Sequence, residues 1–147
     1  MPKSFRLAFK CRKSLRNAMQ KNESAKSAKE IVTEFMQAIE RKDWKTVRSH
    51  ISDNISVLAP GPAKPITFHE AGAYMYYLEH ATGPPPEIEK VIADGNDVCI
   101  TIEVTYPEPP QPVTTLVCGL FHVNDDGKIG SIRFVLDPRE LYKKLGY

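Results

Sequence analysis

Cysteine is scarce in this sequence, and its three cysteines follow no metal-binding or redox spacing. Cys11, Cys99 and Cys118 fit neither a paired zinc-ligand pattern nor a CxxC motif. Cys99 and Cys118 fall within runs typical of strands, where we expect buried free thiols. An odd number of cysteines without a secretory signal favours a reducing compartment, and we therefore expect a cytoplasmic protein.

Long hydrophobic runs are also absent. No stretch of about 18 apolar residues occurs, so we expect no membrane span. The first residues lack the continuous apolar segment of a secretory signal. What remains is an ordinary composition, with 41% hydrophobic and 26% charged residues in a chain of 147. This length and composition indicate one globular domain with a single core.

Acidic residues are missing from the first 22 positions, which carry seven Lys and Arg. The rest of the chain carries thirteen Lys and Arg against eighteen Asp and Glu. We therefore divide the chain into a basic arm, residues 1–24, and a mildly acidic domain, residues 25–147. The arm is expected to be dispensable for folding. A mitochondrial address, a plain solvated tail and non-specific contact with anionic lipid or nucleic acid are the alternatives. A domain specific for nucleic acid would carry its positive charge on the folded face, so no such partner is expected.

Helical periodicity is concentrated in the first half of the domain. Ser27 and Glu30 have the spacing of a capping box and predict a helix over residues 25–41. A short helix capped by Asp43 should follow, and then a strand over Ile55–Ala59. Thr67 and Glu70 have the same capping-box spacing and predict a third helix from Phe68 to about His80. Its tyrosines are Tyr74, Tyr76 and Tyr77, for which packing is the expected role.

After residue 86 the hydrophobic period changes from 3.6 to 2. The predicted strands are Glu87–Ala93, Val98–Tyr106, Val113–Val123 and Lys128–Leu136. Asp94-Gly95 and Asp126-Gly127 are hairpin-turn dipeptides, whereas the proline-rich segment Pro107–Pro112 forms a stiffer connection. Asp137-Pro138 predicts a short closing helix. Helices early and an antiparallel meander late indicate an α+β fold.

Three segments in this order resemble the nuclear transport factor 2-like superfamily and its SnoaL-like domains. They are FMQAIERKDWKTVRSHISDNISVLAPG, PITFHEAGAYM and VCGLFHVNDDGKIGSIRFVLDPRELYKKLG. The superfamily includes polyketide cyclases, ketosteroid isomerases and limonene epoxide hydrolases. The resemblance covers about residues 25–146 and implies a cone-shaped barrel, in which a curved, mostly antiparallel sheet wraps around N-terminal helices. It also implies a pocket on the concave side and a homodimer through the outer sheet face.

The catalytic groups of those enzymes have no counterpart here. A tyrosine, an aspartic acid and an aspartate carry the chemistry of ketosteroid isomerases. By local matching, their places hold Phe35, Gly119 and Ala59, none of which has a titratable side chain. The aspartate that activates water in the epoxide hydrolases is matched by Phe134, next to Arg133. The resemblance therefore implies the fold without the usual catalytic carboxylates.

An apolar pocket is what the resemblance and the strand alternation imply together; the alternative is a closed core. The expected lining is Phe35, Ala59, Met75, Tyr106, Val117, Gly119, Phe121, Ile132 and Phe134. The expected dimer face is Thr114, Leu116, Cys118, Leu120 and His122 with Cys99 and Thr101. No phosphate-binding loop, dinucleotide fingerprint, nucleophile elbow or histidine metal pattern is present, so we expect neither metal nor cofactor.

Two classes of function stay open. A protein that binds an apolar small molecule without turnover is favoured, because acid–base catalysis needs a titratable group beside the substrate. The alternative is an enzyme of the cyclase, isomerase or epoxide hydrolase type that uses other polar residues. A one-residue slip in the matching would turn His122 and Cys118 inward. A cavity in which His122 lay beside a carboxylate such as Glu103 would favour the enzyme.

Overall fold

The computed structural model describes residues 25–59, 64–106 and 112–137, with 139, 142, 143 and 146 in the tail. The basic arm and most of the connection over residues 107–112 lie outside the described residues. So does the loop at residues 60–63, and the predicted closing helix is described only in part. Within the described residues, no helix is long and apolar enough to cross a membrane.

Three helices open the described domain: α2 (Ala28–Glu40), α3 (Trp44–His50) and α4 (Ala71–His80). The predicted capping box begins α2, with Ser27 as the N-cap and Glu30 at the third helical position. Asp43 caps α3 as predicted and accepts a hydrogen bond from the backbone N–H of Thr46. The inner face of α2 is buried through Ile31, Val32 and Phe35, so this helix is the central element of the core.

Six strands form one sheet in the order β2-β1-β6-β5-β4-β3. Their bounds are β1 Ile51–Ala59, β2 Ile66–Phe68, β3 Glu87–Asp94, β4 Asp97–Tyr106, β5 Val113–Val123 and β6 Ile129–Val135. The predicted meander from β3 to β6 is confirmed, because each of these strands pairs antiparallel with the next. β1 pairs parallel with β6 and so joins the first strand to the last. The fold is α+β, as predicted.

The two predicted hairpin turns are confirmed by backbone conformation. Gly95 and Gly127 have φ angles of 57° and 78°, which glycine adopts without steric cost. These turns join β3 to β4 and β5 to β6, and they set the register of both hairpins.

Two predicted boundaries were wrong. Thr67 does not cap a helix: it lies in the short strand β2, opposite Leu58 of β1. Glu70 is instead the N-cap of α4, and its side chain makes no capping hydrogen bond. β1 begins at Ile51, four residues before the predicted start, because Ile51 already pairs with Ile129 of β6. Both errors arise where pairing with a distant strand overrides a local signal.

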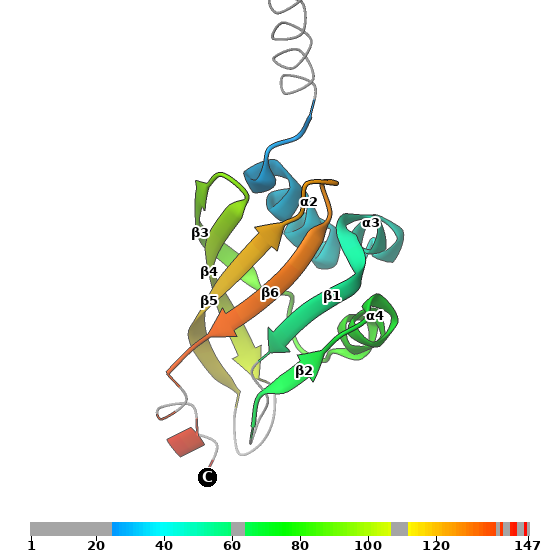
Figure 1. Ribbon diagram of the computed structural model, residues 1–147. Helices are drawn as coiled ribbons and strands as arrows, with labels where there is room; N and C mark the ends of the chain where they lie inside the picture. The colour runs from blue at the N-terminus through cyan, green and yellow to red at the C-terminus, as the bar shows by residue number, and fades with distance from the viewer. Residues whose placement is uncertain are drawn as a thin grey trace, which may run out of the picture.

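The sheet curves around the helices and stays open, so the barrel is incomplete. Figure 1 shows α2, α3 and α4 together behind the sheet. α2 contacts β3, β4 and β5, whereas α4 contacts β1 and β2. One sheet face is therefore concave and covered by helices, and no described helix lies on the other, outer face.

Ser27→Ala should lower the free energy of unfolding by about 1 kcal/mol, because it removes a helix cap. Ser27 Oγ accepts from the backbone N–H of Glu30 at 3.2 Å, and the Glu30 carboxylate accepts from the backbone N–H of Ser27 at 2.8 Å. Urea unfolding followed by circular dichroism measures the change. Gln37→Ala, at an exposed position of the same helix, is the control and should shift stability by less than about 0.5 kcal/mol. Equal losses in the two variants would contradict a stabilising role for the box.

Candidate binding site on the concave face

The alternation of β5 decides which side chains face the concave side. Val117, Gly119 and Phe121 are buried, whereas Leu120 and His122 are exposed. The predicted face of this strand is therefore the buried one. The one-residue slip that would have brought His122 inside does not occur.

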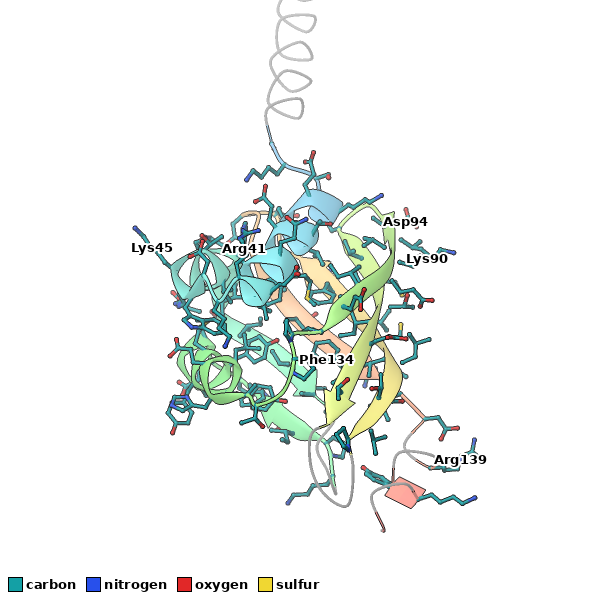
Figure 2. The ribbon with its side chains drawn as sticks, turned by 180° about the vertical axis from the view of Figure 1, so that it is seen from behind. Arg41, Lys45, Lys90, Asp94, Phe134 and Arg139 are labelled. Atoms are coloured by element: carbon teal, nitrogen blue, oxygen red, sulfur yellow. The ribbon has the colours of Figure 1, made fainter. Side chains whose placement is uncertain are left out.

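Three phenylalanine side chains pack together at the base of the concave side, and we call this cluster the phenylalanine floor. Phe121 lies between Phe35 of α2 and Phe134 of β6, and it meets each ring edge to face. The ring centroids are 6.1 Å apart for Phe35 and Phe121, and 6.2 Å apart for Phe121 and Phe134. Figure 2, seen from the helix side, shows Phe134 in the space between α4 and the far strands. The contacts are of the kind that aromatic pairs prefer.

Because Gly119 has no side chain, the phenylalanine rings can pack directly over its backbone. A Cβ atom at Gly119 would lie 2.9 Å from Phe121 Cε2, 3.1 Å from Ile100 Cγ1 and 3.2 Å from Phe134 Cε1. Side chains have therefore filled the volume above this residue. The place matched to the catalytic aspartic acid of ketosteroid isomerases is a packed apolar contact.

The other expected lining residues belong to the same cluster where they are described. Ala59, Met75, Val117 and Ile132 are buried in one core with the phenylalanine floor. The side chain of Tyr106 lies outside the described residues. Eight of the nine expected residues thus lie in or against one packed core, which the alternative of a closed core also implies, and the pocket itself stays a prediction.

The rim of this core consists of partly buried apolar residues, of which Phe134 alone was among the expected lining residues. Ten partly buried apolar residues pack against the core: Ile39, Trp44, Phe68, Tyr77, Leu78, Ile88, Val91, Val104, Phe134 and Leu136. Phe68 of β2 contacts two tyrosines of α4, with ring centroids 5.5 Å from Tyr74 and 5.0 Å from Tyr77. Burial raises the pKa of both phenols, so each stays a neutral hydroxyl.

Charged side chains are missing from the buried residues of the described concave side. No charged residue and no polar residue other than Tyr74 is buried among the described residues. No buried side-chain nitrogen or oxygen of the described part is left without a hydrogen-bond partner. Within the same residues, no group of three or more His, Cys, Asp and Glu side chains could hold a metal ion. The buried residues of this side therefore offer apolar contact and the hydroxyl of Tyr74.

The outer face carries a groove of about 370 Å³ whose lining includes a histidine–carboxylate pair. His122 Nδ1 lies 2.8 Å from a carboxylate oxygen of Asp97, its register partner on β4. His122 lies on the outer face, as predicted, and pairs with Asp97, so the arrangement that would favour the enzyme, His122 beside a carboxylate in the concave cavity, is not found. The two side chains are 48% and 76% exposed, so the pair is a solvated surface contact.

Residues 32–132 match the model of the SnoaL-like domain family. The chain belongs to the SnoaL-like domain family. No curated protein matches it in sequence.

Solved structures agree with this SnoaL-like fold. An NTF2-like protein of unknown function from Cytophaga hutchinsonii is 23% identical, with a TM-score of 0.66 over 81% of this chain and 97% of that one. A LEH-like epoxide hydrolase from M. tuberculosis is 24% identical, with a TM-score of 0.64 over 80% and 88%. A proposed polyketide cyclase from Sinorhizobium meliloti is 18% identical, with a TM-score of 0.59 over 72% and 94%. At these identities the likeness shows the fold alone.

Proposed function

We propose that this SnoaL-like domain binds an apolar small molecule on its concave side and does not catalyse acid–base chemistry there. The main support for this proposal is the close packing of the phenylalanine floor. Phe35 and Ala59 are 1% and 3% exposed, and Gly119 is covered by two phenylalanine rings. These are the places matched to catalytic groups in the related isomerases, and each now contributes only apolar surface.

The rim supports a ligand with an apolar body. Val104 and Leu136 are only partly buried and continue the apolar wall beyond the closed floor. Tyr77 of α4 belongs to the same partly buried set and offers a neutral hydroxyl that can donate a hydrogen bond. Small-molecule sites typically combine such walls with a few polar groups that fix orientation.

The structural neighbours include an epoxide hydrolase and a proposed cyclase, so the alternative is that this chain is also an enzyme. Such chemistry needs an acid or base within hydrogen-bond reach of the substrate. The water-activating aspartate of epoxide hydrolases is matched by Phe134, and losing oxyanion donors alone costs roughly a hundredfold or more in rate. We therefore expect turnover of ketosteroids and epoxides to stay at background.

Val104→Trp should weaken binding of the neutral fluorophore N-phenyl-1-naphthylamine at least about tenfold, because added bulk in an apolar pocket costs roughly 1–3 kcal/mol. Val104 faces inward opposite Thr115. Fluorescence titration of the full chain measures the dissociation constant. Thr67→Trp is the matched control, since Thr67 is exposed on the edge strand β2 and should leave binding unchanged.

Two results would contradict the proposal. One is the absence of saturable binding to the unaltered chain, and the other is an equal loss in both tryptophan variants. Turnover of a ketosteroid or an epoxide above background, abolished by Val104→Trp, would replace the binder by an enzyme that uses the same surface.

We also propose that the domain is a homodimer through its outer sheet face. Five large hydrophobic residues are exposed in the described part of the chain. Ile92, Leu116, Leu120 and Val135 lie on this face, whereas Tyr76 is on α4. Exposed apolar patches of this kind mark interaction surfaces. Cys99 and Cys118 are free thiols that are half-buried rather than buried as expected, and the cytoplasmic location stays a prediction.

A further inference from the structure

Two free thiols meet on the outer face of the sheet. Cys99 of β4 and Cys118 of β5 have their sulfur atoms 3.3 Å apart, and both side chains are half-buried. No sequence motif indicates this pair, because the two cysteines are nineteen positions apart in the chain. Register explains the contact: Cys99 is opposite Leu120, Thr101 is opposite Cys118, and the two thiols are diagonal neighbours.

This diagonal placement disfavours a direct disulfide. Diagonal residues of an antiparallel pair have Cα atoms about 7–8 Å apart. A disulfide usually needs about 4.4–6.8 Å between Cα atoms and a sulfur–sulfur bond of about 2.05 Å. Closing the bond would require two hydrogen-bonded central strands to shift toward each other. A bridging atom needs no such shift, because it sits between sulfurs that remain apart.

We propose that Cys99 and Cys118 form a dithiol site that captures a trivalent arsenic compound, bridged by both sulfur atoms. Thiolates are soft ligands and select soft, thiophilic elements. The sulfur separation of 3.3 Å suits a single atom that bonds both sulfurs at close to a right angle. The flanking side chains also suit an apolar substituent, because Ile92 and Leu120 line the groove beside Cys99.

The reaction balances without an oxidant. An arsenoxide, in which arsenic carries one organic group and one oxygen, meets two thiols. Two arsenic–sulfur bonds form, the arsenic–oxygen bond breaks, and the oxygen leaves as water with the two thiol protons. Burial and the hydrogen bond with Cys99 raise the pKa of Cys118, so the thiol form that supplies this proton predominates at neutral pH.

The test uses phenylarsine oxide on the full chain with Cys11→Ser, which removes the third thiol. Intact-mass analysis should show one adduct per chain that survives excess glutathione and is released by dithiothreitol. Cys99→Ser and Cys118→Ser, each added separately, should weaken capture about a hundredfold or more, because the second sulfur bond is intramolecular only in the pair. Thermal melting checks that each variant is folded, and alanine replaces serine at a position where it is not.

The assay is repeated in the Leu116→Asp background, where the proposed dimer should not form. A second copy of the chain that covers the two thiols can then be distinguished from a dithiol site that does not bind arsenic. A resistant adduct in either background that needs both cysteines supports the proposal. No resistant adduct in either background overturns it, as does an adduct that persists with one cysteine. Formation of an intramolecular disulfide with oxidised glutathione, in place of the adduct, would also overturn the preference for a bridged pair.

Discussion

Gly119→Asp should destabilise the domain by roughly 4 kcal/mol or more, enough to unfold a domain of ordinary stability in part. Overpacking a core typically costs about 1–3 kcal/mol, and burying a polar group without a partner costs about as much again. Both costs apply, because the new Cβ would lie 2.9 Å from Phe121 and 3.1 Å from Ile100. No charged residue is buried among the described residues, so the carboxylate would have no cationic partner.

Gly72→Asp is the matched control for this substitution. Gly72 lies in the first turn of α4, and no heavy atom lies within 4 Å of the place that a Cβ would occupy there. An aspartate at this position gains from the helix dipole, so the stability of the variant should be unchanged or slightly higher. Urea unfolding of the three proteins gives the comparison. A loss below about 1 kcal/mol for Gly119→Asp would contradict a closed floor at this position.

A partial rescue would identify the rings as the cause. Phe134→Leu shortens the side chain that meets the new Cβ at 3.2 Å, so the double variant with Gly119→Ala should be more stable than the sum of the single losses predicts. Additive losses would place the strain elsewhere. The packing around β5 thus leaves no space for a carboxylate at position 119, and a single substitution cannot restore an isomerase-like site.

Strand alternation was the part of the fold that could be predicted best from the sequence. β5 was predicted with its observed bounds, Val113–Val123, and with the correct face inward. Its apolar odd positions need a buried face, and a slip by one residue would bury His122 in their place. The start of α2 was equally readable, because the Ser27 capping box is a local contact between neighbours in sequence.

Contacts between distant residues explain what could not be predicted from the sequence. Thr67 has the local spacing of a cap, yet β1 pairs with its segment and makes it a strand. The pair of Asp97 and His122 and the pair of Cys99 and Cys118 both depend on the register of β4 against β5. That register follows from the bounds of two long strands, and it has no short motif. The rim residue Phe68 was missed for the same reason.

Leu116→Asp should convert the proposed dimer into a monomer. In a two-fold interface each chain contributes one copy of the new aspartate. Burying each unpaired carboxylate costs several kcal/mol, so the dimer should associate roughly a thousandfold or more weakly. Leu116 is 53% exposed on the bare face of β5, where it can change without disturbing the core. Light scattering at micromolar concentration should give about twice the chain mass of 16.6 kDa for the unaltered protein, and one chain mass for the variant.

Tyr76→Asp separates this effect from the general loss of an exposed hydrophobic residue. Tyr76 is 66% exposed on α4, on the helix side of the sheet, so this variant should keep the mass of a dimer. Equal melting temperatures for the two variants at low concentration would show that neither disturbs the core. A single-chain mass for the unaltered protein would contradict the dimer, and so would a Leu116→Asp chain that keeps the double mass. Because the concave and outer faces alternate along β5, loss of the dimer should leave the phenylalanine floor intact. Fluorophore binding by monomeric Leu116→Asp would then show that each chain holds a complete site.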